Sequence, residues 1–353
     1  MHPIIRYFGT SITLTVLSVI LAGVLFGPGA AITTIILIAI EIAFSFDNAV
    51  INAKILARLS KVWQQLFLTI GMVIAIVGMR FVFPILIVMV TADLSWGTVI
   101  DDALHHPKVY GEHLEDAHTA ISSFGGAFLL TLTLYFLFDE HRKEVWLDRI
   151  ERPLQRVKSG VWLPPLLVSL LIVALALFEH GGERSTILRA GLAGAISYAA
   201  IHLFIEALGR ISGNGDAKES TSNNKAMYTG WGAFLAFMYL QILDASFSFD
   251  GVLGAFAITD KIVLIALGLG VGAIWVRSLT VYMVRKGTLD AYKYLEHGAH
   301  YAILVLSLAL LGAIYIEVPD AITGAVGLGI IWASYMASKQ AIRDRKSWST
   351  TKA

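Results

Sequence analysis

Apolar segments long enough to cross a lipid bilayer recur along the whole chain, with polar stretches between them. A membrane-spanning helix needs about 20 mostly apolar residues. The run LPPLLVSLLIVALALF, residues 163–178, has no polar face at helical spacing, which argues against a water-soluble helical protein. The pattern predicts an all-α polytopic membrane protein with about ten transmembrane helices, over residues 7–26, 30–57, 64–92, 118–139, 161–179, 187–209, 228–258, 262–284, 298–316 and 321–338.

The positions of the basic residues test this number of helices, because lysine and arginine favour cytoplasmic loops. With both termini in the cytoplasm, the cytoplasmic segments hold 21 of the 27 lysines and arginines, and the outer segments hold 4. The other two, Arg80 and Arg277, fall inside predicted helices. The bias predicts a multi-pass protein of the inner or plasma membrane with both termini cytoplasmic.

The apolar and polar stretches divide the chain into six parts. These are residues 1–140, a first membrane repeat with four spans; 141–160, a basic cytoplasmic linker; 161–210, the fifth and sixth spans; 211–227, a flexible loop; 228–338, a second membrane repeat with an extra C-terminal span; and 339–353, a basic cytoplasmic tail. The linker is read either as an amphipathic segment at the lipid headgroups or as a solvated connection. The acidic outer segment 93–117 is read as a hydrophilic loop, which either concentrates cations or is merely solvated.

The composition excludes several classes of protein. Charged residues make up 15% of the chain, against about a quarter in soluble domains. The formal net charge of +1 and the lack of a basic domain argue against a nucleic-acid partner. Because the chain has no cysteine, it has no disulfide, no thiolate metal site and no cysteine nucleophile. The lipid bilayer is the partner that composition predicts, and the oligomeric state stays open.

Three short patterns occur twice in the same order, which indicates an ancient duplication. In the first pair, each segment has an acidic residue, then any two residues, then Phe-Ser-Phe-Asp. In the second pair, a glycine precedes an arginine by nine residues. The pairs are EIAFSFDNAV (41–50) with DASFSFDGVL (244–253), Gly71 and Arg80 with Gly268 and Arg277, and LEDAHTAI (114–121) with LEHGAHYAI (295–303).

The two acidic motifs fall in the predicted second and seventh spans, which cross the membrane in opposite directions. The two halves of the chain are therefore predicted to form an inverted repeat. Transporters built in this way hold their substrate near the bilayer midplane, where the repeats meet. Gly251 and Gly254, directly after Asp250, would permit a local break of the helix, and a straight, tilted helix is the alternative.

Acids inside a membrane span are costly and usually face a partner or a water-filled path. On a helix, Glu41, Ser45 and Asn48 share one face. The candidate ion ligands are Glu41, Asp47, Asn48, Asp244 and Asp250, supported by Ser45 and Ser248. We expect Asp47 and Asp250 to approach each other near the centre of the membrane, with Glu41 and Asp244 on opposite sides of that centre.

Arg80 and Arg277 lie near the middle of their predicted spans and need counter-charges. Four motif acids against two arginines leave a formal charge of −2, which suits one divalent cation or two monovalent ions. Two ion pairs that only lock helices together are the alternative, although such pairs would need only one acid per arginine. Oxygen ligands without thiolate or histidine favour Mg²⁺, Ca²⁺ or Mn²⁺ over copper or zinc. The residues thus favour a transporter that needs no cofactor besides the transported cation and has no enzymatic activity.

The stretches EIAFSFDNAVI, DGVLGAFAIT and GAIWVR resemble the signature helices of the TerC-like membrane proteins, within the LysE-type and cation exporter assemblage. The resemblance covers most of residues 30–310. It implies a multi-span inner-membrane transporter with manganese efflux as the favoured activity. The positions that it carries over are Glu41, Asp47, Asn48, Asp250 and Thr259. The added acid Asp244, the glycines after the second motif and the long outer segment differ from the common pattern and indicate a divergent subfamily.

Two other functions remain open from the residues. An exporter of an amino acid or another small solute would use Arg80 or Arg277 to bind a carboxylate. An intramembrane aspartyl protease would share a proton between Asp47 and Asp250. The residues SFSF precede Asp250, however, where such enzymes typically carry a Gly-x-Gly-Asp motif.

Four further polar residues are candidates for a proton relay or an inner vestibule. His202 and Glu206 are spaced four apart and share one helical face, and Glu296 and His300 have the same spacing. A structural hydrogen bond between helices is the alternative role for His202 and Glu206. Simple placement at the membrane interface is the alternative for Glu296 and His300.

Overall fold

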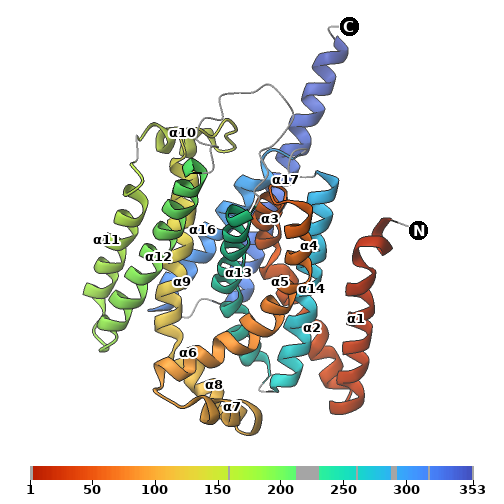
Figure 1. The fold of residues 1–353 in the computed structure, drawn as a ribbon, viewed down its shortest axis with the longest axis vertical. Helices are drawn as coiled ribbons and strands as arrows, with labels where there is room; N and C mark the ends of the chain where they lie inside the picture. The colour runs from red at the N-terminus through yellow and green to blue at the C-terminus, as the bar shows by residue number, and fades with distance from the viewer. Residues whose placement is uncertain are drawn as a thin grey trace.

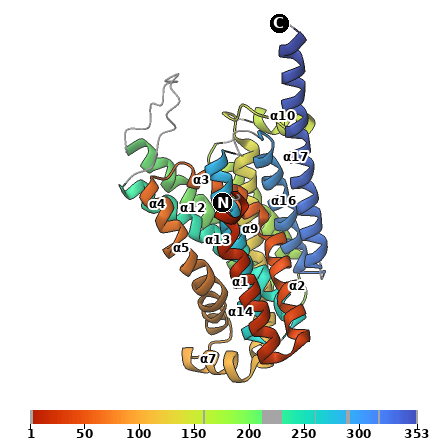
Figure 2. The same cartoon turned by 90° about the vertical axis from the view of Figure 1, so that its right-hand side faces the viewer.

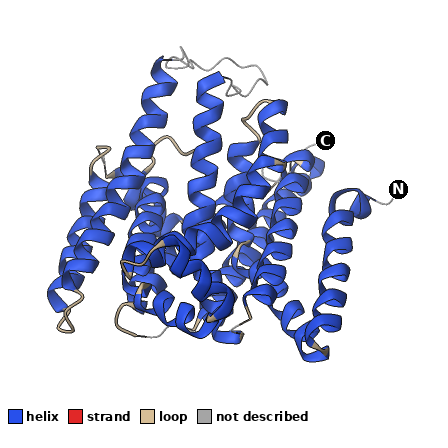
Figure 3. Ribbon diagram, turned by 60° about the horizontal axis from the view of Figure 1, so that its bottom comes forward, coloured by secondary structure: helices blue, strands red, loops and turns tan. Residues whose placement is uncertain are grey.

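The computed structural model describes residues 3–157, 160–211, 230–259, 261–287, 292–316 and 319–351. The regular elements in these ranges are all helices, as Figure 3 shows. The all-α prediction is therefore confirmed for the described part of the chain.

The helices differ in length from one turn to more than eight turns. In chain order they are α1 (Pro3–Phe26), α2 (Pro28–Phe44), α3 (Phe46–Leu56), α4 (Lys61–Leu68), α5 (Ile70–Val73), the π-helix η1 (Ile74–Val82), α6 (Phe83–Thr91), α7 (Trp96–His105), α8 (Pro107–Asp116), α9 (His118–Phe138), α10 (Asp148–Arg156), α11 (Leu163–Phe178), α12 (Arg184–Ile211), α13 (Gly230–Ile258), α14 (Ile262–Lys286), α16 (Leu295–Ala313) and α17 (Asp320–Thr351).

Six of the described helices are long and apolar enough to cross a membrane, or seven when one bent pair counts as a single span. They are Tyr7–Phe26, Lys61–Gly78, His118–Phe138, Arg184–Phe204, Ile262–Lys286 and Leu295–Ala313, with Pro28–Ala43 and Asn48–Leu56 as the bent pair. The described helices thus support a multi-pass membrane protein with fewer candidate spans than the ten predicted. Length is one reason, because the predicted span at α11 is a helix of only 16 residues.

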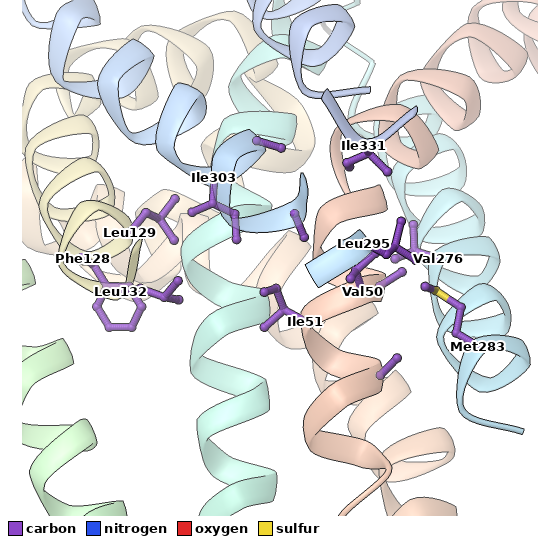
Figure 4. Close-up of a cluster of buried hydrophobic side chains, with 14 of the residues drawn as sticks. Val50, Ile51, Phe128, Leu129, Leu132, Val276, Met283, Leu295, Ile303 and Ile331 are labelled. Atoms are coloured by element: carbon purple, nitrogen blue, oxygen red, sulfur yellow. The ribbon is translucent and has the colours of Figure 1, made fainter. Parts of the chain in front are cut away.

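Helices from both halves of the chain pack together in the interior. In Figure 1, α9 lies between α12 and α16, and α14 packs against α1 and α2. Figure 4 shows the central cluster of buried apolar side chains, to which both halves contribute, among them Val50 and Phe128 with Val276 and Ile303. α1 instead exposes apolar side chains such as Val24, as expected for a helix that faces lipid.

The outer segment forms two short helices, which corrects its prediction as a loop. α7 and α8 lie at the end of the molecule opposite α10, and α7 marks that end in Figure 2. On α7, Val99 and Ala103 lie four residues apart and share one face. On α8, Tyr110 and Leu114 are also four residues apart on one face. All four side chains pack in one cluster with Val88 of α6. The acids of this segment are therefore carried by a packed helical cap.

One buried glutamate holds the linker between the halves against a membrane helix. The Glu151 side chain on α10 has no exposed surface, and its carboxylate accepts hydrogen bonds from Arg142 Nη2 at 2.8 Å and from the Leu147 N–H at 3.1 Å. From α16, His297 Nε2 and the Tyr301 hydroxyl each lie 3.3 Å from this carboxylate. The linker is therefore docked on α16, which contradicts its reading as a freely solvated connection.

We expect Glu151→Gln to loosen the linker. Burial by itself raises the pKa of the Glu151 carboxyl, but the hydrogen bonds from His297 and Leu147 and the charges of His297 and Arg142 outweigh burial and lower that pKa. An acid with a lowered pKa stabilises the fold above its ordinary pKa, and this contribution is lost as the pH falls through the lowered value. At neutral pH, limited proteolysis should cut the linker of the variant faster than that of the wild type. Cleavage of the wild-type linker should speed up only below about pH 4, where Glu151 begins to take up a proton.

The matched control for this experiment is Asp148→Asn on the same helix. Asp148 is exposed and pairs with Arg152 one turn away, so its charge contributes little to docking. Equal cleavage rates in the Glu151 and Asp148 variants would contradict the docking role of Glu151.

Candidate functional site

The first acidic motif contains a break between two helices. α2 and α3 meet at Ser45 and differ in direction by 55°. The Ser45 hydroxyl donates a hydrogen bond to Glu41 Oε1 at 2.9 Å, a local side-chain contact one turn back along the chain. The second motif behaves differently, because the backbone of α13 runs unbroken from Gly230 to Ile258. The break that the glycines after Asp250 would permit is therefore absent, and the first span is the bent one.

Polar side chains from α2, α3, α13 and α14 surround a small buried cavity beside this break. Its volume is about 30 Å³, which is enough for a single dehydrated ion or a water molecule. The cavity is lined by Glu41, Ser45, Asn48, Asn52, Phe67, Asp244, Ala273, Val276, Arg277 and Thr280. Both copies of the acidic motif thus contribute to one cavity.

The first acids of the two motifs lie at the same cavity. Their placement on opposite sides of the point where Asp47 and Asp250 meet stays a prediction, because nothing is described of those two aspartate side chains. Glu41 reaches the cavity from the end of α2, and Asp244 reaches it from α13. Asn52 of α3 donates a hydrogen bond through Nδ2 to Asp244 Oδ1 at 2.8 Å. Glu41, Ser45, Asn48 and Asn52 have the spacing of one helical face, and this face lines the cavity on both sides of the bend at Ser45.

Glycines of α14 allow this helix to approach α2 closely at Glu41, which is only 1% exposed. A Cβ atom at Gly272 would lie 2.5 Å from both Cβ and Cγ of Glu41. A Cβ atom at Gly268, one turn earlier, would lie 2.4 Å from Cβ of Leu37. Small residues four apart permit such close packing of membrane helices. The two glycines therefore determine how deeply the Glu41 side chain is buried.

We expect Gly272→Ala to push α14 away from α2 and to lower stability by about 1–3 kcal/mol. Gly329→Ala is the matched control, since a Cβ atom at Gly329 in α17 meets nothing within 4 Å. Alanine in an open helical position is favoured over glycine by about 1 kcal/mol, so the control should be slightly stabilised. Thermal unfolding in a mild detergent measures both changes. A Gly272→Ala protein as stable as the control would contradict the close approach.

Arg277 of α14 is buried, with 6% of its surface exposed, and binds the second acidic motif. Its Nη2 donates to the Gly71 carbonyl at 2.8 Å and to Asp244 Oδ2 at 3.3 Å, and its Nη1 donates to the Phe67 carbonyl. The guanidinium carbon also lies 4.1 Å from the centroid of the Phe67 ring. Arg277 therefore contacts a motif acid, as the charge balance predicted, and also ties α14 to the interrupted helices α4 and α5.

Asn52 is a candidate ligand that sequence reasoning missed. Its side chain is 3% exposed and lines the cavity. Because Nδ2 donates to Asp244, Oδ1 is left buried without a hydrogen-bond partner among the described residues. A buried oxygen without a donor costs free energy unless a ligand or water satisfies it. Asn52 follows Asn48 by four residues on the same helical face, and this spacing could have identified it.

Part of the predicted site lies outside the described side chains. The helical backbone is described at these positions, but nothing is described of the side chains of Asp47, Arg80, Glu206, Ser248 and Asp250. Thr259 is described and lies just beyond the end of α13, about 22 Å along the helix from Asp244. The structure therefore does not bring Thr259 to the cavity.

The described relay candidates separate into two locations. His202 and His300 both line a second, wider cavity of about 410 Å³. Glu296 forms an ion pair with Lys54 at the end of α3 and does not line either cavity. Sequence spacing alone therefore grouped Glu296 with His300 although their side chains have different surroundings.

The charge and chemistry of the small cavity suit a cation. Two carboxylates and one guanidinium among the described lining residues leave a formal charge of −1. The described residues contain no cluster of three or more His, Cys, Asp or Glu side chains that could hold a metal ion. The described donors are instead mixed oxygens, since amide and hydroxyl groups of Asn48, Asn52 and Ser45 accompany the carboxylates. Such hard oxygen donors are the ligands of Mg²⁺, Ca²⁺ and Mn²⁺.

Comparison with known proteins identifies the family. A family model described as a protein of unknown function, DUF475, matches residues 46–346, which is most of the chain. No curated protein and no solved structure matches the sequence. The match includes α3, α13 and α14, while Glu41 and Ser45 directly precede it. This chain is therefore a multi-pass membrane protein that belongs to the DUF475 family.

Proposed function

We propose that the protein is a membrane transporter that exports divalent metal cations, with Mn²⁺ as the preferred substrate. The observation that carries the proposal is the buried cavity beside the bend of the first motif. It has room for one ion, a formal charge of −1 from its described side chains, and the unsatisfied oxygen of Asn52. The predicted ligands Asp47 and Asp250 would add two further carboxylates to the site.

The choice of Mn²⁺ rests on three arguments. Oxygen donors select Mg²⁺, Ca²⁺ and Mn²⁺ from among the common divalent metals. Mg²⁺ gives up its water shell reluctantly, so a cavity with room for one ion but not for its water shell favours the other two. The resemblance to TerC-like proteins, which we extend to this chain as part of the proposal, then favours manganese efflux.

The packing of the helices supports an inverted repeat that shares this site. The helices of the first motif, α2 and α3, pack on α14, which carries Arg277. The helix of the second motif, α13, packs on η1, which carries Arg80. The third matching pair of segments leads into α9 and α16, and these two helices pack on each other. Reciprocal contacts of this kind are what two halves related by a twofold axis would make.

The proposal includes the orientation and the class of activity. The bias of basic residues supports a place in the inner or plasma membrane with both termini in the cytoplasm. No enzymatic activity is proposed. A solute exporter that binds a carboxylate through Arg277 is less favoured, since that side chain is buried and already donates to Asp244 and to two carbonyls.

Metal content of cells tests the proposal directly. Cells that express the protein should hold less manganese than cells that express Glu41→Gln at the same level, when both grow in excess Mn²⁺. The substitution keeps the shape of a cavity-lining carboxylate and removes its charge. Magnesium, calcium and zinc measured in the same samples give the selectivity. Equal content of every metal in the two strains would overturn the proposal.

A further inference from the structure

The second cavity is large enough for a small organic molecule. Its volume of about 410 Å³ lies in the usual range for small-molecule sites. It is formed by α3, α9, α11, α12, α13 and α16, together with the residues that follow α9 and the residues that lead into α11. The cavity opens at the end of α9 that faces α10, where Asp139 and Glu140 are exposed.

Aromatic rings form much of its wall. Tyr198 and Tyr239 share a hydrogen bond between their hydroxyls at 3.3 Å, and the Tyr135 hydroxyl donates to the Val161 carbonyl at 2.6 Å. Phe136 stacks on the ring of His300 with centroids 3.6 Å apart. These contacts hold the rings in place, and ordered aromatic walls are the common surface for binding organic cations.

The polar groups of the wall include a buried histidine and two exposed carboxylates. His300 is buried, and its Nδ1 donates to the Glu296 carbonyl at 2.9 Å. Its Nε2 is then an acceptor without a hydrogen-bond partner among the described residues. No lysine or arginine is among the described lining residues. Arg142 lies behind the wall, with its guanidinium carbon 4.0 Å from the centroid of the Phe136 ring and its Nη2 bound to Glu151. The His141 ring also lines the cavity, with Nδ1 3.7 Å from Asp139 Oδ1. The wall therefore offers aromatic faces, an acceptor nitrogen and the carboxylates of Asp139 and Glu140.

We propose that this cavity binds a small organic ammonium ion, with its apolar part against the tyrosine rings and its cationic nitrogen toward Asp139, Glu140 and His300. Cation–π attraction and the two carboxylates favour the charged ligand, and the apolar wall favours a ligand larger than a metal ion. The cavity is distinct from the ion site, with which it shares no lining residue. On α3, Ile51 lines the wide cavity whereas Asn48 and Asn52 line the small one.

The test compares a cation with a neutral molecule of nearly the same shape. Binding of n-butylammonium and of 1-butanol is measured by saturation-transfer NMR on the protein in lipid nanodiscs, with empty nanodiscs as the blank. We expect saturation transfer from the protein to n-butylammonium. The concentration of 1-butanol at half-saturation should be about tenfold higher than that of n-butylammonium. Equal binding of the two probes would overturn the proposal.

Variants locate the binding. Asp139→Asn with Glu140→Gln removes both exposed charges without disturbing a packed side chain and should weaken n-butylammonium binding about tenfold. Gly160→Trp should block the cavity, since Gly160 lines it and a Cβ atom there meets nothing within 4 Å. Asp148→Asn, a charge change on α10 outside the cavity, should bind as the wild type does.

The result does not depend on metal transport. Glu41→Gln alters the ion site alone and should leave n-butylammonium binding unchanged. Binding that is the same in the wild type, the Asp139 and Glu140 double variant and Gly160→Trp would overturn the proposal, whatever the cells' manganese content.

Discussion

Replacement of Arg277 by leucine should destabilise the protein by about 3–5 kcal/mol, the usual cost of removing one partner of a buried ion pair. Arg277 is buried, and its loss would leave the Asp244 carboxylate and the carbonyls of Phe67 and Gly71 without their guanidinium donor. The helices α4 and α5 would also lose their link to α14. Thermal unfolding in detergent measures the effect. It is monitored as the loss of the monodisperse peak in size-exclusion chromatography.

Two further variants separate charge from packing. Arg277→Leu combined with Asp244→Asn should be more stable than Arg277→Leu alone, because the unpaired carboxylate is no longer present. Arg277→Lys should lie between the wild type and Arg277→Leu, since a lysine keeps the charge but cannot reach three acceptors in the same fork geometry. If Arg277→Leu unfolds at the wild-type temperature, the buried pair is not a structural link.

Asp47→Asn and Asp250→Asn should each abolish Mn²⁺ efflux while the protein remains inserted and folded. Asparagine keeps the shape of aspartate, so the change removes charge at the positions that the sequence repeat singles out. The four motif acids and the two arginines, Arg80 included, have a formal charge of −2. One carboxylate fewer leaves −1, which no longer balances a divalent cation that has lost its water shell. Efflux from Mn²⁺-loaded proteoliposomes measures the rate, with Mg²⁺ and Ca²⁺ as competitors.

Asp101→Asn is the matched control for both aspartates. It makes the same change on α7, at an exposed position where the carboxylate contacts only the His105 side chain among the described residues. Its efflux rate should equal that of the wild type. Full efflux by the Asp47→Asn, Asp250→Asn double variant at matched protein levels would rule out the carboxylate site.

The sequence by itself determined the class of the protein and the positions of the acidic residues within its apolar segments. Long apolar runs follow from the bilayer's thickness, which any spanning helix must match, so the all-helical membrane architecture could be predicted. The acids of the two motifs stand out because charge in an apolar run is costly. The described helices include six or seven candidate spans against the ten predicted, in part because hydropathy does not reveal that α11 is short. Hydropathy also does not reveal that the outer segment is helical.

Only the tertiary structure decided which residues meet. Asn52 bonds to Asp244 across 192 residues of sequence, and Arg277 bonds to the Gly71 carbonyl across 206. The packing of α13 against α2 and α3 brings Glu41 and Asp244 to one cavity, and the docking of Glu151 on α16 makes the linker a packed element. Hydropathy and spacing are properties of neighbours along the chain, whereas a cavity, a buried ion pair and an unsatisfied oxygen arise from the packing of distant helices.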